Sequence, residues 1–323
     1  MLLDVPAEIL LGILLAILAI AYFAGQALRR QPQSVVNPAI VDTFLYRIRA
    51  WWLLYAVLGA SFLIPYGRLA TVILFGILSF WALREFITLT PTRLGDHRAL
   101  FWVFFVFTPA QYILVALGQQ YFETYSILIP VYGFLFVPTR VALAGDSRRF
   151  LERTAKIQAG LLICVYALSH APALLDLQLI KDGEKWRGGS AGMLLFFLLV
   201  VQFGDLSQFL WGKLIGKRVI APAINSSKTW EGFVASVLTT TLLGGLFWPV
   251  TPFNLLEAAC MSLVIAVMGF AGSMTMSAIK RDRGVRDYGT LVQGHVGILD
   301  RMDSICFAAP VFFHLTRLFF SAA

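Results

Sequence analysis

Residues 190–210 read SAGMLLFFLLVVQFGDLSQFL, and no charged residue interrupts them before Asp205. A helix rises about 1.5 Å per residue, so about 20 apolar residues cross the hydrocarbon core of a bilayer. The whole chain has this character, because 59% of its 323 residues are apolar, 14% are charged, and the mean hydropathy is +0.77. Ordinary soluble domains are about 45–50% apolar and about 25% charged. The composition therefore excludes a disordered chain and a nucleic-acid-binding arm, and it predicts an integral membrane protein.

Ten segments have the length and apolarity of a transmembrane helix, which predicts an all-α, polytopic protein. Pro130 and Pro138 break the fifth segment, and Ser169, His170 and Pro172 place the end of the sixth at the membrane interface. No long polar stretch and no repeat divides the chain, so we expect one transmembrane domain over 1–323. Its parts are N-terminal helices in 1–190 and C-terminal catalytic helices and cytoplasmic loops in 191–323. The segments are 7–28, 50–66, 69–90, 99–118, 122–143, 157–176, 190–210, 232–249, 255–279 and 302–321.

The basic residues are divided unequally between the two sides of such a bundle. Of the 26 Lys and Arg residues, 21 fall in the five loops that share one side, and 5 fall on the other side. Cytoplasmic loops of membrane proteins carry an excess of Lys and Arg. The pattern predicts cytoplasmic basic loops and both termini on the non-cytoplasmic side, and it accounts for most of the net charge of +8. The basic loops are 29–49, 84–98, 140–156, 211–231 and 280–301.

The segment 205–232 contains more than the cations that anchor a loop. Asp205 lies at the cytoplasmic end of its span, and an ionisable residue at that depth indicates a functional site. The run of Ser226, Ser227, Lys228 and Thr229 precedes the eighth span. Hydroxyls, an ammonium group and the N–H groups of a helix start together form a phosphate cradle. The structural alternative is that Asn225 or Ser226 simply caps the helix.

The segment 277–304 is the second candidate. Ser277, Lys280 and Arg281 are spaced to share one helix face near the membrane surface, where lipid phosphates lie. Asp300 and Asp303 are three residues apart, so a helix that begins near residue 299 directs both carboxylates to one side. Paired carboxylates beside cations suit Mg²⁺ that bridges phosphate oxygens. The structural alternative makes both acids N-terminal helix residues that interact with the helix dipole.

Single polar residues elsewhere are weaker signals. Arg84 and Glu85 lie inside the third span and are candidates to flank the site, but adjacent residues do not face one another on a helix. His170 and His314 are lone histidines on apolar helices, and we interpret them as structural. Gly212 and Gly216 permit close backbone approach.

The pattern Ser277-x-x-Lys280-Arg281, then Arg286-Asp287, then Gly294-His295-x-Gly297-x-Leu299-Asp300-Arg301-x-Asp303-Ser304 resembles the signature of the phosphatidate cytidylyltransferases, or CDP-diacylglycerol synthases. The segment Asp205…Gly212…Gly216-Lys217, followed by Ser226-Ser227-Lys228-Thr229-Trp230-Glu231-Gly232, resembles their second hallmark. Together these motifs cover about the last third of the chain.

The resemblance implies that CTP and phosphatidate react to give CDP-diacylglycerol and pyrophosphate, with Mg²⁺ as cofactor. The expected partners are CTP, phosphatidate and membrane lipid, without nucleic acid, and a homodimer is compatible. The compact chain favours a bacterial inner membrane with the active site facing the cytoplasm. Combined with the patterns above, the candidate catalytic residues are Asp287, Asp300, Asp303, Lys280, Arg281 and Arg301. The candidate substrate-binding residues are Ser226, Ser227, Lys228, Thr229, Ser277, Gly294, His295, Gly297 and Lys217, and the candidate metal ligands are Asp300, Asp303, Asp287 and Asp205.

Several positions depart from the usual family pattern. Arg286 stands where Lys is usual, Val296 where Gly is usual, and Gln208-Phe209 where a small residue and Tyr are usual. These departures indicate a divergent paralogue and leave a different lipid phosphate open as the substrate. They are also compatible with a catalytically silent relative. A membrane transporter is a further hypothesis, but the clustering of the polar residues at the cytoplasmic ends of the helices disfavours it.

Overall fold

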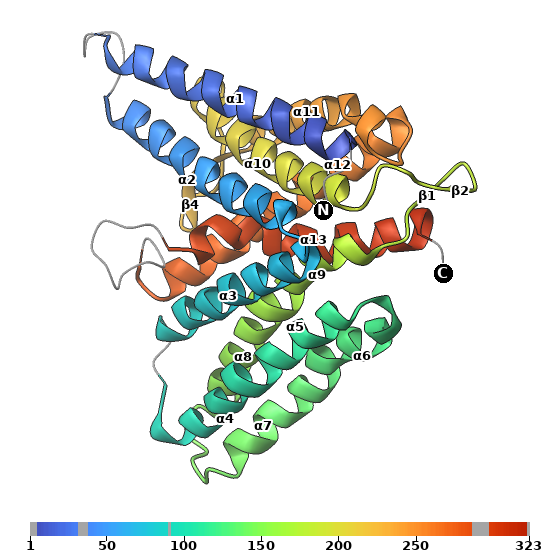
Figure 1. Ribbon diagram of the computed structural model, residues 1–323. Helices are drawn as coiled ribbons and strands as arrows, with labels where there is room; N and C mark the ends of the chain where they lie inside the picture. The colour runs from blue at the N-terminus through green and yellow to red at the C-terminus, as the bar shows by residue number, and fades with distance from the viewer. Residues whose placement is uncertain (1–4, 32–37, 90–91, 286–296, 322–323) are drawn as a thin grey trace.

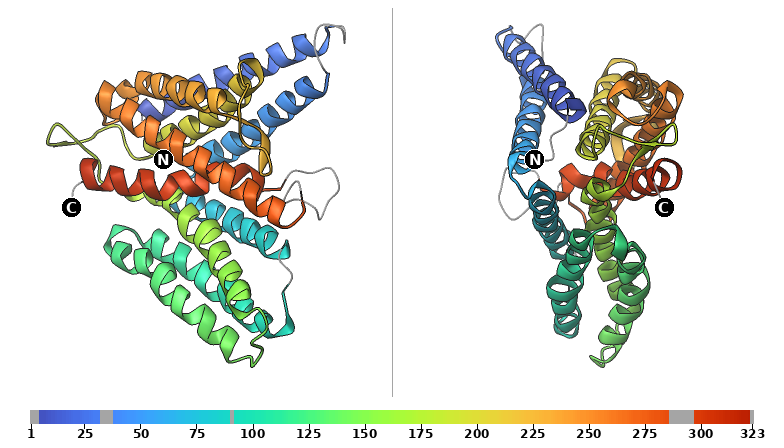
Figure 2. Two further views of the ribbon diagram at one scale, coloured as in Figure 1. Left: turned by 180° about the vertical axis from the view of Figure 1, so that it is seen from behind. Right: turned by 45° about the vertical axis from the view of Figure 1, so that its right-hand side comes forward.

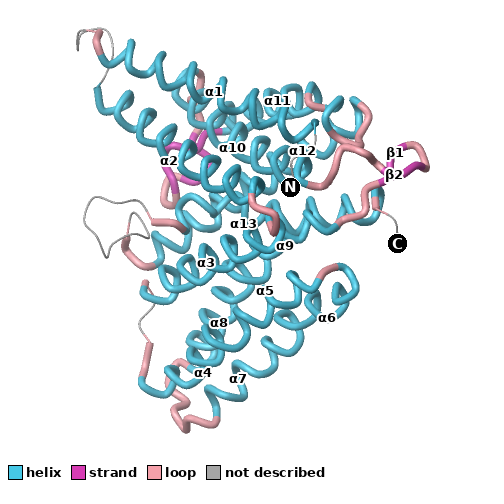
Figure 3. Tube along the Cα trace, viewed as in Figure 1, coloured by secondary structure: helices cyan, strands magenta, loops and turns pink. Residues whose placement is uncertain are grey.

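The computed structural model describes residues 5–31, 38–89, 92–285 and 297–321, and most of them are helical (Figures 1 and 3). The α-helices are α1 (Val5–Arg29), α2 (Pro38–Leu63), α3 (Gly67–Thr88), α4 (His97–Trp102), α5 (Thr108–Leu117), α6 (Phe122–Ile127), α7 (Phe134–Ala142), α8 (Phe150–Gly160), α9 (Leu168–Ala173), α10 (Ala191–Leu214), α11 (Trp230–Leu246), α12 (Leu255–Asp282) and α13 (Leu299–Phe320). The π-helical segments are η2 (Val103–Phe107), η4 (Leu128–Gly133) and η5 (Leu161–Ala167). Short 3-10 turns are η1 (Leu94–Asp96), η3 (Gln119–Tyr121), η6 (Leu174–Asp176) and η7 (Trp248–Val250).

Two short antiparallel hairpins lie at opposite ends of the helices, as Figure 3 shows. One pairs β1 (Ile180–Lys181) with β2 (Glu184–Lys185), and the other pairs β3 (Val219–Ala221) with β4 (Asn225–Thr229). In the second hairpin Val219 lies opposite Thr229, and the register shifts before Ala221 meets Asn225.

Eight helical stretches in the described part of the chain are long and apolar enough to cross a bilayer. This confirms the prediction of an all-α, polytopic membrane protein. Two further helices are not among them: α2, with 26 residues, and α11, which has only 17 residues. The number of ten spans therefore stays a prediction. The eight stretches are Ala7–Arg29, Gly67–Thr88, Leu94–Leu117, Gln119–Ala142, Phe150–Asp176, Ala191–Leu214, Leu255–Asp282 and Leu299–Phe320.

The fifth predicted segment is continuous, so the expected break at Pro130 and Pro138 was wrong. Proline removes one backbone hydrogen bond and its ring crowds the preceding turn. The chain accommodates Pro130 by widening into the π-helical segment η4, and helix α7 continues through Pro138. In the sixth segment Ser169 and His170 are completely buried in the protein interior.

The C-terminal helices pack closely with one another. Helix α10 contacts α11, α12 and α13, and α12 packs against both α11 and α13. Helices α1 and α2 flank this group, while α13 also contacts α3 and α9, which lead to the bundle of α4–α8 (Figures 1 and 2). Helix α13 therefore lies between the two groups of helices and is covered on both sides.

The helix ends that flank the five basic loops lie at one end of the molecule in Figure 1. Hairpin β1–β2 and the C-terminal end of α13 lie at the opposite end. Ion pairs brace the basic end: the Arg153 guanidinium donates to both carboxylate oxygens of Asp96 with Nε–O distances of 3.0 Å, and Arg283 Nη2 lies 3.7 Å from Glu152 Oε1. Arg283 and Glu152 thus connect the end of α12 to α8.

Candidate functional site

Polar side chains from α10, α12, α13 and β4 converge at the basic end of the bundle. Hairpin β3–β4 lies against α10 and α12 (Figure 2), and α12 packs along α13. Asp205 comes from α10, Lys280 from α12, Lys228 from β4, and Asp300 and Asp303 from α13. Segments nearly 100 residues apart in the sequence therefore contribute to one cluster.

The two carboxylates at the centre of the cluster are Asp205 and Asp303, and Ser304 links them. The Ser304 backbone N–H donates to Asp303 Oδ1 at 2.7 Å. Its hydroxyl donates to Asp205 Oδ1 at 2.8 Å and lies 3.4 Å from Asp303 Oδ1. Because Ser304 is completely buried, this link fixes the distance between α10 and the first turns of α13.

Two lysines compensate the negative charge. Lys280 Nζ lies 2.6 Å from Asp300 Oδ1, and the two side chains are 15% and 6% exposed. Lys228 Nζ donates to Gln208 Oε1 at 2.5 Å and lies 5.8 Å from the centre of the Phe270 ring. Both lysines also interact electrostatically with Asp303. The cluster thus combines three carboxylates with two ammonium groups, a composition suited to holding phosphate and a divalent cation.

Helix α13 begins at Leu299, as the sequence predicted, and Glu85 of α3 stabilises this beginning. The Glu85 carboxylate accepts hydrogen bonds from the backbone N–H groups of Ile298 at 3.1 Å and Leu299 at 2.8 Å. Free N–H groups at a helix start need such acceptors. Glu85 is only 6% exposed. The sequence signal of this role was the presence of an acidic residue within an apolar span.

The predicted phosphate cradle at residues 226–229 has a different local structure. These residues form most of strand β4, with Ser226 and Ser227 exposed. The N-cap of α11 is Thr229, whose hydroxyl accepts from the Gly232 N–H at 3.2 Å, so the expected cap at Asn225 or Ser226 was wrong. The strand precedes the helix because β4 finds its backbone partners in β3.

The predicted face of α12 is divided between two neighbours. Ser277 accepts a hydrogen bond from the Asn225 amide at 3.2 Å, and Arg281 Nε donates to the Ile224 carbonyl at 3.1 Å. Both contacts hold the tip of hairpin β3–β4 against α12. Lys280 points instead towards α13, where it pairs with Asp300.

The glycines of the first motif serve close packing, as predicted. A Cβ atom at Gly216 would overlap the Gly212 carbonyl oxygen and would lie 2.5 Å from Thr229 Oγ1. Only glycine allows the end of α10 to pass so close to Thr229. The backbone N–H groups of Lys217 and Arg218 both donate to Glu231 Oε2 at 3.0 Å, and the Lys217 side chain is exposed.

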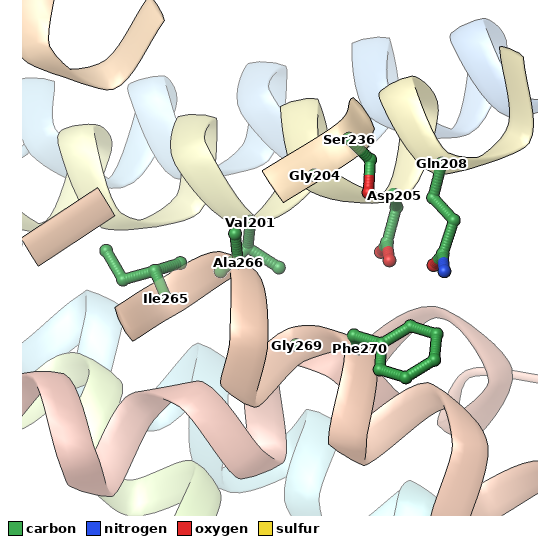
Figure 4. Close-up of a pocket in the computed structure, with 9 residues that line it drawn as sticks. All are labelled: Val201, Gly204, Asp205, Gln208, Ser236, Ile265, Ala266, Gly269 and Phe270. Carbon is green, nitrogen blue, oxygen red and sulfur yellow. The ribbon is translucent and has the colours of Figure 1, made fainter. Parts of the chain in front are cut away.

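A groove between α10, α11 and α12 opens beside the cluster (Figure 4). Its enclosed space is small, about 10 Å³, and the groove is partly open to the outside. Figure 4 shows Asp205 and Gln208 at one end, both directed towards Phe270, and Ile265 and Val201 at the other. The groove is therefore polar near the charged cluster and apolar farther along α10. Its lining residues are Val201, Gly204, Asp205, Gln208, Ser236, Ile265, Ala266, Gly269 and Phe270.

Some predicted site residues cannot be placed. Asp287, Gly294 and His295 lie outside the described residues. Gly297 is buried directly before α13, and Arg301 lies in the first turn of α13, partly buried. The described residues thus bring together Asp205, Asp300, Asp303, Lys228 and Lys280 from the predicted set.

The donor set fits a hard cation such as Mg²⁺. Within residues 5–31, 38–89, 92–285 and 297–321, no three Asp, Glu, His or Cys side chains gather as a metal centre would require. Asp205 and Asp303 nevertheless share the Ser304 link. Mg²⁺ is commonly held by one or two carboxylates together with substrate phosphates and water. The pair therefore fits a metal that arrives with a polyphosphate.

Comparison with known proteins gives the chain its family. A model described as "Cytidylyltransferase family" matches residues 46–319. The Escherichia coli (strain K12) protein called "Uncharacterized protein YnbB" is 39% identical over 272 residues, which cover 84% of this chain and 86% of that protein.

Two relatives carry the name "Phosphatidate cytidylyltransferase". The Aquifex aeolicus (strain VF5) protein is 29% identical over 65% of this chain and 78% of its own length. The Bacillus subtilis (strain 168) protein is 35% identical over 39% of this chain and 48% of its own length. Because the family model spans nearly all the described helices, this chain belongs to the cytidylyltransferase family of integral membrane proteins.

Proposed function

We propose that this protein transfers the cytidylyl group of CTP to phosphatidate and releases pyrophosphate, with CDP-diacylglycerol as the product. The observation that carries the proposal is the pairing of Asp205 and Asp303 through Ser304 beside Lys228 and Lys280. This cluster lies at the polar end of a groove whose other end is apolar. CTP would enter from water, while the acyl chains of phosphatidate remain in lipid.

The reaction requires charge neutralisation more than proton transfer. The phosphatidate phosphate attacks the α-phosphorus of CTP, a new P–O–P bond forms, and the bond to pyrophosphate breaks. The attacking phosphate is already largely an oxyanion at neutral pH, because the second pKa of a phosphate monoester is about 6. In-line positioning and neutralisation of two anions then supply most of the catalysis.

We assign this neutralisation to four cationic side chains, Lys228, Lys280, Arg281 and Arg301. The two lysines act on Asp303 and are therefore placed to meet phosphates that approach the carboxylates. Lys280 also keeps Asp300 in position through their ion pair. Arg281 holds the tip of the β3–β4 hairpin at the Ile224 carbonyl, which keeps Lys228 on β4 near the cluster.

The metal ligands in this proposal are Asp303 and Asp300, together with Asp205 and Asp287. When bound, Mg²⁺ would supply positive charge that offsets the negative charge of the triphosphate. Ser304 would keep the Asp205 and Asp303 carboxylates close enough to share one ion. The basic loops support an active site that faces the cytoplasm, and the named relatives from bacteria support the bacterial inner membrane.

The decisive experiment uses purified full-length protein with labelled CTP, Mg²⁺ and phosphatidate, and measures labelled lipid and pyrophosphate. Wild-type protein should form both products, and Asp303→Asn should form neither while retaining the wild-type thermal midpoint within a few degrees. Arg30→Ala is the matched control, because Arg30 is exposed at the end of α1. A parallel reaction with a polyprenyl phosphate tests a different lipid acceptor. Product with polyprenyl phosphate alone, or full activity of Asp303→Asn, would contradict the proposal.

A further inference from the structure

Gln208 is a buried polar residue with one unpaired end. Its side chain is on α10, one helical turn beyond Asp205, and the residue is 4% exposed. Gln208 Oε1 accepts from the Lys228 ammonium group, whereas Gln208 Nε2 is buried and has no hydrogen-bond partner in the described structure. A buried donor without a partner is energetically unfavourable, because it has lost its hydrogen bonds to water and gained none in the protein. Such a group in a groove indicates a ligand that supplies the missing acceptor.

The orientation of this amide follows from the chemistry of its partner. An ammonium group only donates hydrogen bonds, so the oxygen of Gln208 must face Lys228. The amide nitrogen, Nε2, then points away from Lys228, and its two N–H groups are free to donate to a different acceptor. Figure 4 shows the amide directed into the groove beside the Asp205 carboxylate, on the side of Phe270.

The surroundings of Gln208 define what the acceptor is attached to. On one side lie Asp205 and the lysines, which suit a phosphate. On the other side Val201, seven residues earlier on α10, lies about 10 Å away along the helix axis, and Ile265 and Ala266 continue this apolar wall. A ligand at Gln208 therefore has an anionic group at one end and a hydrocarbon group at the other. In a diacyl lipid phosphate, the ester carbonyls lie between those two parts.

We propose that Gln208 determines lipid specificity by donating a hydrogen bond from Nε2 to an ester carbonyl of an acylated glycerol phosphate. The inference deepens the proposed function and rests on it for the lipid phosphate substrate. Lys228 fixes the amide orientation, so the same lysine that meets phosphate also sets which lipid linkage is recognised. A lipid phosphate without an ester, such as a dialkyl ether or a polyprenyl phosphate, leaves the Gln208 donor unpaired.

The test compares two lipids that differ only at the linkage, diester phosphatidate and its diether analogue. Their dissociation constants are measured with purified full-length protein in detergent, without CTP. Wild-type protein should bind the diester about tenfold more tightly, which corresponds to about 1.4 kcal/mol. In Gln208→Glu this ratio should fall to about one, because the carboxylate still accepts from Lys228 but offers no donor.

Two further variants separate recognition from folding. Gln208→Met removes the donor without adding a charge and should also reduce the ratio to about one. Gln202→Met is the matched control, since Gln202 is another buried glutamine of α10 and does not line the groove; it should keep the tenfold preference. A preference that survives in both Gln208 variants, or that is absent in the wild type, overturns the inference. Weaker CTP binding with an unchanged lipid ratio would also overturn it, because the amide would then face the nucleotide.

The lipid-binding measurement is independent of turnover. Loss of the diester preference in Gln208→Glu supports the inference even if wild-type protein transfers no cytidylyl group to phosphatidate, an outcome that refutes only the proposed reaction. Conversely, cytidylyl transfer to diester and diether lipids at equal rates, with equal affinities, would support the reaction and refute the role of Gln208.

Discussion

The Lys280–Asp300 pair offers the sharpest test of the site, because removing one partner should have a different effect from removing both. The charged atoms are 2.6 Å apart, and the side chains are 15% and 6% exposed. At an effective dielectric constant of about 20, the attraction between them is roughly 6 kcal/mol, most of which offsets their desolvation. Removing one member of such a buried pair destabilises a protein by about 3–5 kcal/mol. Lys280→Met or Asp300→Asn alone should therefore lower the thermal midpoint clearly and abolish cytidylyl transfer.

The double variant Lys280→Met/Asp300→Asn distinguishes a structural pair from a catalytic one. The double variant removes one positive and one negative charge together, so its thermal midpoint should return close to the wild-type value. Cytidylyl transfer should remain undetectable, because both groups are assigned to the substrate or its metal. Both properties are measured on the same purified samples, with Arg30→Ala as an exposed control. Destabilisations that simply add would show that the pair is not coupled, and recovered activity would show that it is only structural.

Three other predictions follow from contacts around the cluster. Glu85→Gln should destabilise the start of α13 by about 1.5–3 kcal/mol and reduce cytidylyl transfer, because a charge-assisted acceptor of two N–H groups is lost. Arg84→Gln is the control and should have a smaller effect on both stability and cytidylyl transfer. Equal effects of the two substitutions would contradict the role of Glu85. Gly216→Ala should lower stability by about 1–3 kcal/mol, since its Cβ has no space, whereas Gly12→Ala, with nothing within 4 Å, should have the wild-type thermal midpoint. Lys228→Met should raise the KM for CTP about tenfold through loss of a charged phosphate contact, and an unchanged KM would remove Lys228 from the site.

The local sequence was sufficient to predict the helical fold and the start of α13. Apolar runs about 20 residues long have few alternatives to a membrane helix, because every backbone polar group in lipid must be satisfied within its own segment. The start at Leu299 was also predictable, since the two acids at Asp300 and Asp303 follow glycine-rich sequence. The strand at residues 225–229 was not predicted, because its stability depends on pairing with β3 and not on its own composition.

The grouping of the two motifs on one side of the molecule could be predicted from charge alone. The basic loops alternate along the chain, so segments 205–232 and 277–304 had to emerge at the same end of the bundle. Which carboxylate meets which lysine could not be predicted in this way. Lys280 shares a helix face with Ser277 and Arg281 in the sequence pattern, yet it pairs across to α13 while the other two contact the hairpin.

The sequence by itself determined that this chain is a membrane protein with acids and bases at one end of its helices, because length, apolarity and charge are properties of each segment alone. Only the tertiary structure decided that Ser304 joins Asp205 to Asp303, that Glu85 stabilises the start of α13, and that Gln208 leaves one donor in an amphipathic groove. These contacts join helices whose relative rotation and depth depend on packing against several neighbours at once. No single segment encodes that packing, and the chemistry of the site depends on it.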